Sequence, residues 1–297
     1  MMPLLFAMPG NEALAARLGQ LLGWDAGVIA VRRFPDGESC LRFLTEIKGR
    51  EVALVCTLDR PDDKLLPLYF AASIARELGA RRIGLIIPYL AYMRQDARFQ
   101  EGEGITSAHF ARLVSGFADW LLTVDPHLHR HRTLRAIYSI RSAVVHAAPA
   151  IAQWIAGNVR RPLVIGPDAE SEQWASEVAK GAGCPYTVLQ KTRRGDREVE
   201  VSVPDSAQWQ GRTPVLVDDI VYTARTMIAA TAHLHAAGLA APVCIAVHPV
   251  FAGDACAALQ AAGVERIVSC NTIAHPSNQI DLSGPIAAAL QQMAAHK

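Results

Sequence analysis

The segment Val217-Asp218-Asp219-Ile220-Val221-Tyr222-Thr223-Ala224-Arg225-Thr226 carries the pattern that decides the fold. The apolar run Pro214–Val217 leads into it and predicts a buried strand, and the residues beyond it predict a helix from Thr226 to Ala237. Hydroxyls and backbone N–H groups at a helix start bind phosphate, and carboxylates bind sugar hydroxyls or hydrated Mg²⁺. The same residues, taken alone, would also suit an ordinary capped helix after a polar turn.

The alternation of apolar runs with amphipathic stretches extends over most of the chain. Further strands are predicted at Leu4–Met8, Val52–Thr57, Ile83–Pro88, Trp120–Val124, Leu163–Ile165, Thr187–Gln190, Val243–Val247 and Ile267–Cys270. Helical patterns separate most of these strands, which predicts an α/β fold with mainly parallel sheets flanked by helices. At roughly 100–200 residues per domain, a chain of 297 residues suggests two domains. We place the boundary near Ala148, giving domains 1–147 and 148–297.

The composition argues against nucleic acid and membranes as general partners of the protein. Apolar residues make up 51% of the chain, and 29 basic residues balance 28 acidic ones to a net charge of +1. This balance gives no general attraction to nucleic acid or to an anionic membrane. No apolar run approaches the roughly 20 residues that span a bilayer. The six cysteines contain no C-x-x-C pair, so we expect reduced thiols and a cytoplasmic protein.

Charged or metal-binding side chains follow several of the predicted strands. In open parallel sheets, ligands bind beyond the carboxyl ends of the strands. The polar segments at these ends are Tyr89–Asp96, Asp125–His129, Gly166–Asp168, Lys191–Arg194 and Asp218–Asp219. One such segment would be ordinary loop polarity, whereas five together favour a polyanion site. Two local alternatives stay open: Lys191–Arg194 as a solvated charge run, and His127 as part of a structural metal site with His129 and His131.

Several segments together resemble the ribose-phosphate diphosphokinases, also called PRPP synthetases. Phe34–Glu38 resembles their F-x-D-G-E turn, and Pro88–Asp96 resembles their P-Y-x-x-Y-x-R-Q-D segment. Asp125-Pro126-His127 resembles their D-L-H. Val217–Thr226 is similar to the PRPP-binding loop that these enzymes share with type I phosphoribosyltransferases. The similarity runs in order across nearly the whole chain.

The resemblance implies two tandem type I phosphoribosyltransferase-like domains, the first with the ATP motifs and the second with the ribose 5-phosphate loop. It implies a Mg²⁺-dependent transfer of the diphosphoryl group of ATP to the 1-hydroxyl of ribose 5-phosphate, which gives PRPP and AMP. The implied ATP-binding residues are Phe34, Asp36, Gly37, Glu38, Arg94, Gln95 and Asp96. The implied ribose 5-phosphate-binding residues are Asp218, Asp219, Tyr222, Thr223, Ala224, Arg225 and Thr226. Lys191 and Arg193 match the catalytic lysine and arginine, and His127 and Asp168 match residues at the metal.

The chain also departs from the commonest members of this family. Ala224 and Arg225 stand where many relatives have glycine, and Tyr222 stands where many have Asp or Ser. These features resemble the divergent, archaeal-like members, and the family resemblance implies a homo-oligomer. Two other functions stay open. Ala224-Arg225 would suit a non-catalytic regulatory paralogue, and the loop alone would suit a phosphoribosyltransferase, although the F-x-D-G-E and R-Q-D segments argue against the latter.

Overall fold

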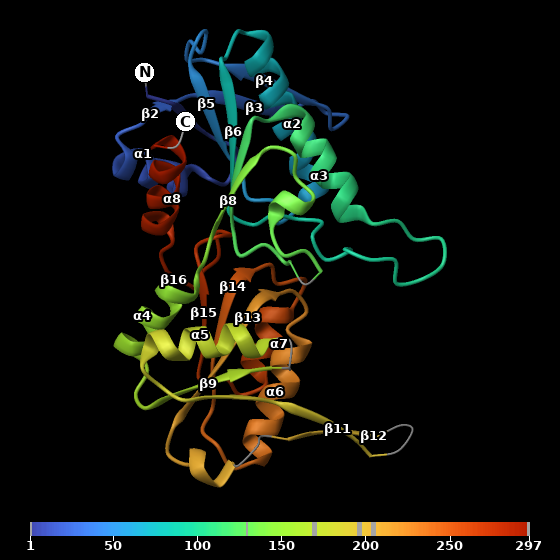
Figure 1. Cartoon of the computed structure of the whole chain (residues 1–297), viewed down its shortest axis with the longest axis vertical. Coiled ribbons are helices and arrows are strands. Elements are labelled where there is room, and N and C mark those ends of the chain that lie inside the picture. The colour runs from blue at the N-terminus through green and yellow to red at the C-terminus, as the bar shows by residue number, and fades with distance from the viewer. Residues whose placement is uncertain (1, 129, 168–170, 195–197, 203–205, 296–297) are drawn as a thin grey trace. The chain divides into compact units, whose positions relative to one another are not determined.

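The chain divides into two compact units (Figure 1). The computed structural model describes residues 2–128, 130–167, 171–194, 198–202 and 206–295, and for residues 190–194 and 198–202 it describes the backbone alone. Unit 1 comprises Met1–Val145 together with Ser283–Lys297, and unit 2 comprises His146–Leu282. Unit 2 therefore begins close to Ala148, and the segment Ser283–Lys297 is grouped with unit 1 rather than with the rest of the second half.

Unit 1 is built on a six-stranded sheet in the order β2-β1-β5-β6-β7-β8. Its strands are β1 (Leu4–Ala7), β2 (Asp25–Gly27), β5 (Glu51–Val55), β6 (Arg82–Ile87), β7 (Trp120–Val124) and β8 (Arg141–Val145). Every neighbouring pair is parallel. The central strands are buried on both faces, which is why continuous apolar runs rather than alternating ones predicted them.

Helices cover both faces of this sheet, and an antiparallel hairpin extends from it. α1 (Glu12–Leu22) packs with α8 (Ser283–Ala295) on one face, and α2 (Pro61–Glu77) packs with α3 (Thr106–Phe117) on the other (Figure 1). The hairpin consists of β3 (Ile29–Arg33) and β4 (Ser39–Phe43), and residues 34–38 form its turn. A single 3₁₀ turn, Leu134–Ala136, precedes β8.

Unit 2 repeats the parallel six-stranded arrangement, with the order β10-β9-β13-β14-β15-β16. Its strands are β9 (Pro162–Gly166), β10 (Tyr186–Val188), β13 (Thr213–Val221), β14 (Val243–Pro249), β15 (Arg266–Cys270) and β16 (Asn278–Ile280). A separate antiparallel hairpin joins β11 (Gln190–Arg194) to β12 (Glu198–Ser202), and a 3₁₀ turn covers Ser206–Trp209. Together the two sheets confirm the predicted α/β class and its parallel sheets.

The helices of unit 2 also lie on two faces. α4 (Ala148–Asn158) and α5 (Glu172–Ala182) pack together on one face, and α6 (Arg225–Ala236) and α7 (Ala255–Ala261) pack on the other (Figure 1). The core between α6, α7 and the sheet includes Leu163, Leu216 and Leu234, all fully buried. In the described part of the chain, no helix combines the length and the hydropathy that crossing a membrane requires.

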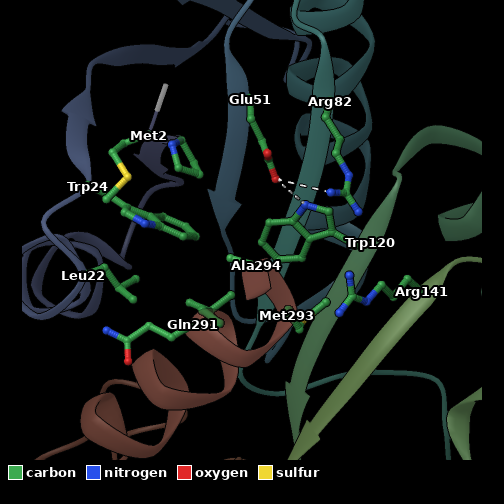
Figure 2. A pocket seen from close by; sticks show the side chains of 12 residues that line it. Met2, Leu22, Trp24, Glu51, Arg82, Trp120, Arg141, Gln291, Met293 and Ala294 are labelled. Carbon is green, nitrogen blue, oxygen red and sulfur yellow. Dashed lines mark hydrogen bonds and ion pairs between the residues drawn. The ribbon is translucent and has the colours of Figure 1, made fainter. Parts of the chain in front are cut away.

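A pocket of about 300 Å³ lies at the amino ends of the unit 1 strands (Figure 2). Glu51, Arg82, Trp120 and Arg141 are the first residues of β5, β6, β7 and β8, and the last turns of α8 complete the lining. The Glu51 carboxylate is only 4% exposed; it accepts a hydrogen bond from Trp120 Nε1 at 3.1 Å and faces Arg82 Nη1 at 3.9 Å. Glu51 is thus paired within the sheet, and the α8 residues beside it make the pocket part of the surface on which α8 docks.

Candidate functional site

The segment Val217–Thr226, with which the sequence analysis began, starts inside β13. The sequence predicted that the strand ends at Val217, but β13 continues to Val221 and contains both Asp218 and Asp219. The extension has a physical cause: β14 continues alongside, with Ile220 opposite His248 and Val221 opposite Pro249. Both aspartates are half-buried, and their Oδ1 atoms accept backbone N–H bonds from the next residue at 3.0 and 2.7 Å.

The turn after β13 opens to solvent at the start of α6. Tyr222, Thr223, Arg225 and Thr226 are exposed, whereas Ala224 is buried and takes a left-handed conformation with φ 57°. Ala224 is the residue immediately before α6, and its carbonyl accepts the helical bond from Ile228 N–H at 2.9 Å. The first N–H groups of a helix have no partner within the helix, so this turn directs unpaired backbone donors and positive helix-dipole potential outward.

The loop after β14 supports this turn from the side. Phe251 N–H donates to Val221 O at 2.9 Å, and Ala252 N–H donates to Tyr222 O at 2.8 Å. Phe251 itself has a positive φ of 23°, an uncommon conformation for a bulky residue. Backbone hydrogen bonds thus fix the turn independently of its side chains, which explains how a loop with alanine and arginine in place of glycine keeps its course.

His248 and Thr272 lie at the same edge of the unit 2 sheet, and neither was among the predicted site residues. His248 is the sixth residue of β14 and is 1% exposed. The Thr272 hydroxyl donates to Val247 O at 2.7 Å, so it acts as acceptor toward His248 Nδ1 at 3.0 Å. This arrangement places the proton of a neutral His248 on Nδ1. The sequence contained a signal for both residues. His248 directly follows the apolar run Val243–Val247, and Thr272 comes two residues after the apolar run that ends at Cys270.

A second polar cluster follows β15. His275 Nδ1 and Ser277 Oγ are 2.7 Å apart, and Ser277 Oγ lies 2.6 Å from Ser269 Oγ. The His275 ring packs against Phe251 with centroids 4.9 Å apart, and burial lowers the pKa of His275 below its usual value. The cluster therefore supports Phe251 and the loop after β14, which in turn holds the turn before α6.

In unit 1, the predicted ATP turn forms the exposed tip of the β3–β4 hairpin. Phe34 N–H donates to Glu38 O at 2.8 Å, and Gly37 N–H donates to Phe34 O at 2.9 Å. Gly37 has φ 95°, which the turn requires and which glycine adopts without strain. Asp36 Oδ1 accepts from Glu38 N–H at 3.1 Å, and the guanidinium of Arg32 stacks over the Phe34 ring at 4.5 Å. Phe34 is 40% exposed, so its ring is accessible to a ligand.

The R-Q-D segment separates into one outward and two inward side chains. Arg94 is exposed. Gln95 accepts from the Thr106 hydroxyl through its side chain and from Ser107 N–H at 3.2 Å through its carbonyl, which anchors the start of α3. Asp96 is 8% exposed and its Oδ1 lies 3.2 Å from Arg130 Nε. Of the three residues in this segment, Arg94 is the one that is exposed.

The predicted catalytic and metal residues are placed only in part. His127 is half-buried in the loop after β7, whose first residue, Asp125, bonds through its N–H to Val145 O at 3.0 Å. Asp168 lies outside the described residues, and Lys191 and Arg193 belong to β11, of which the backbone alone is described. Among the residues described, no group of three or more His, Cys, Asp or Glu side chains is arranged to hold a metal ion.

Models of two protein families match the chain. The model of the N-terminal domain of ribose phosphate pyrophosphokinase matches residues 3–117, and that of the phosphoribosyl transferase domain matches residues 134–283. The fold is also similar to the crystal structure of phosphoribosylpyrophosphate synthetase from Mycobacterium smegmatis, with a TM-score of 0.87 over 100% of both chains at 21% identity. The first family model matches most of the sequence of unit 1, and the second matches the sequence of unit 2.

Similar proteins of known name give the same result over the whole length. A ribose-phosphate pyrophosphokinase of Methanopyrus kandleri is 34% identical over 292 residues, which cover 98% of this chain and 99% of that protein. A ribose-phosphate pyrophosphokinase of Saccharolobus solfataricus is 33% identical over 243 residues, 81% of this chain and 82% of that one. Both organisms are archaea, in line with the expected archaeal-like character. With these matches and both units accounted for, the chain belongs to the ribose-phosphate pyrophosphokinase family.

Proposed function

We propose that this chain transfers the diphosphoryl group of ATP to the 1-hydroxyl of ribose 5-phosphate, releasing AMP and PRPP. The observation that carries the proposal is the presence, in one chain, of two solvent-facing recognition segments of different kinds. One is the anion-ready turn before α6, and the other is the exposed pair of Phe34 and Arg94 in unit 1. A phosphoribosyltransferase acting on a nucleobase would require only the first.

We assign ribose 5-phosphate to unit 2. The 5-phosphate would accept from the free N–H groups at the start of α6 and from the exposed hydroxyls of Thr223 and Thr226. Asp218 and Asp219 would accept hydrogen bonds from the ribose hydroxyls. Arg225 occupies the first position of α6 and is exposed, so its guanidinium can reach a phosphate without displacing the backbone.

We assign ATP to unit 1, with the adenine near the Phe34 ring and the phosphates near Arg94. We assign Asp36, Gly37 and Glu38, which are exposed in the same turn as Phe34, to ATP as well. We also assign Gln95 and Asp96 to ATP, beside Arg94 in the same loop. Domain roles follow: the N-terminal motifs bind the nucleotide, and residues beyond the boundary near Ala148 bind the sugar phosphate.

The chemistry requires positioning and charge neutralisation more than covalent help. The ribose O1 attacks the β-phosphorus, the bond from that phosphorus to the α,β-bridging oxygen breaks, AMP leaves with the bond electrons, and the O1 proton passes to solvent. Lys191 would act as a point charge and Arg193 as a two-pronged donor on the transferring phosphates. Mg²⁺ is commonly held by one or two protein side chains and the substrate phosphates, and we assign His127 and Asp168 to its surroundings.

An AMP-release assay with ribose 5-phosphate and Mg–ATP tests the proposal. The wild-type protein should release AMP and PRPP in equal amounts, and Lys191→Ala should lose most turnover with its fold intact. An absence of AMP at high enzyme concentration would overturn the assignment and leave the regulatory paralogue. The regulatory paralogue is suggested by Ala224 and Arg225, which replace glycine in many relatives. It predicts that the chain co-purifies with an active relative. Arg225→Gly separates the two, because restored turnover would show that Arg225 obstructs the phosphate.

We further propose that the protein is a cytoplasmic homo-oligomer of two or more copies, as the family resemblance implies. The balanced net charge and the six free cysteines suit a cytoplasmic protein. Light scattering coupled to size exclusion, performed with and without Mg–ATP, measures the number of copies directly. The family resemblance implies that the F-x-D-G-E turn reaches the ATP site of a neighbouring copy, so a monomer under both conditions would contradict this proposal.

A further inference from the structure

The first turn of α2 contacts both of the segments that we assign to ATP. Arg33, the last residue of β3, donates from Nη2 to Asp63 O at 3.0 Å, and the same guanidinium lies 3.8 Å from Asp63 Oδ1. The Tyr92 hydroxyl donates to Asp62 Oδ1. Two consecutive residues of one helix therefore tie down the hairpin that carries Phe34 and the loop that carries Arg94.

Tyr92 holds an unusual backbone conformation at this point. Its φ is 60°, in the left-handed region that a bulky residue adopts only when its surroundings enforce it. Two contacts enforce it here: the hydrogen bond to Asp62 on α2, and packing of the Tyr92 ring on Phe110 of α3 with centroids 4.9 Å apart. The bend is therefore fixed from two helices.

The bend determines where Arg94 points. Before it, Tyr89 is bound to the strand end, because its carbonyl accepts from Leu58 N–H at 3.0 Å. After it, Met93 is 1% exposed and Gln95 is anchored at α3, so Arg94 alone projects outward between two fixed neighbours. A loosened Tyr92 would let this short segment change direction and carry the guanidinium away from the nucleotide.

We propose that Asp62 and Tyr92 are positioning residues for ATP recognition, acting on Arg94 through the left-handed bend at Tyr92. This inference rests on the proposed function, since it presumes that Arg94 binds the nucleotide phosphates. Burial and the Asp62 carboxylate raise the pKa of Tyr92 to about 12. The phenol therefore remains a donor throughout the neutral range, and the contact with Asp62 persists at working pH.

Steady-state kinetics of Tyr92→Phe and Asp62→Ala test the proposal, with ATP and ribose 5-phosphate varied separately. Each variant should raise the KM for ATP by about tenfold, the size expected for losing one hydrogen bond to a charged group. The KM for ribose 5-phosphate should stay within twofold of wild type. The double variant should be no worse than the poorer single one, because both changes remove the same contact.

Two matched variants serve as controls. Tyr69→Phe removes a hydroxyl from a tyrosine of α2, and Glu77→Ala removes an exposed carboxylate from the last residue of the same helix. Both should retain the wild-type KM for ATP. Circular dichroism melting of all variants separates misfolding from mispositioning. If Asp62→Ala melts well below wild type, Tyr92→Phe decides the test, because it keeps the ring that packs on Phe110 and removes only the hydroxyl.

Failures of the two proposals differ. A wild-type protein that makes no AMP contradicts the proposed function, whereas an active wild type with an unchanged KM for ATP in Tyr92→Phe contradicts the positioning role alone. Equal rises in both KM values, or additive losses in the double variant, would also overturn it, since they indicate general damage rather than a shared contact that serves ATP.

Discussion

At the scale of single residues, Ala224 is the most informative departure from the family pattern. It keeps the left-handed conformation that glycine would adopt freely, with φ 57°. We predict that Ala224→Gly raises the free energy of unfolding of unit 2 by about 0.5–1 kcal/mol, because relief of the left-handed strain exceeds the added entropy of the unfolded chain. Denaturant titration followed by circular dichroism measures the change.

The control for Ala224→Gly is Ala237→Gly at the other end of α6. Ala237 has φ −80°, a conformation that alanine adopts without strain. Glycine there should lower the free energy of unfolding or leave it unchanged. A stabilisation of equal size at both positions would contradict the role of the left-handed turn, and loss of activity in Ala224→Gly would show that alanine is required.

His275 gives a pH dependence. Burial lowers its pKa in the folded protein below the usual 6.5, so the unfolded chain binds a proton more readily. Stability therefore rises with pH through this window and is lost as the pH falls below about 6.5. We predict that His275→Gln flattens the loss of thermal stability between about pH 7 and pH 5, as measured by melting temperature. His235→Gln, an exposed change on α6, should leave the wild-type slope.

At the scale of elements, the packing of β6 against β7 depends on Gly84. A Cβ at Gly84 would lie 1.8 Å from the Trp120 ring, whose indole is held by Glu51. We predict that Gly84→Ala destabilises unit 1 by about 1–3 kcal/mol or more, since a well-packed core cannot absorb the methyl group. Gly116→Ala is the matched control, because Gly116 lies in α3 with no atom near its Cβ position. It should stabilise α3 slightly, and the two melting temperatures make the comparison.

The sequence predicted the elements whose signals are local. The central strands β5, β6, β7 and β14 are continuous apolar runs, and the turns at Gly37 and Ala224 follow from nearby residues. The short edge strands β2, β8 and β16 were missed, because three to five residues that are mostly not fully buried form a strand only by pairing with a neighbour already in place.

The candidate site also contains residues that the sequence could predict and contacts that it could not. Polar residues at strand ends are visible in the sequence, so Arg94 and Asp218 could be chosen there. The partner of Tyr92 is Asp62, 30 residues away, and the partner of His248 is Thr272, 24 residues away. No local pattern records such pairs, because the fold alone brings them together.

At the scale of the whole molecule, α8 links the end of the chain to unit 1. Its residues Ile286, Ala287 and Leu290 are buried, and α8 packs on α1, β7 and β8. We predict that removing residues 283–297 lowers the melting temperature of unit 1 and exposes apolar surface that binds the dye ANS. Replacing Gln292 with alanine, an exposed change on α8, should do neither. Equal stability of the shortened and full chains would show that unit 1 is complete without α8.

The return of α8 also has a consequence for the order in which the protein is made. In the chain, unit 2 is an insertion between β8 and α8 of unit 1. A ribosome therefore releases every residue of unit 2 before it releases the last helix of unit 1. Unit 1 is therefore completed only after unit 2, and until α8 emerges the surface of α1, β7 and β8 on which it packs remains accessible to chaperones or to another nascent chain.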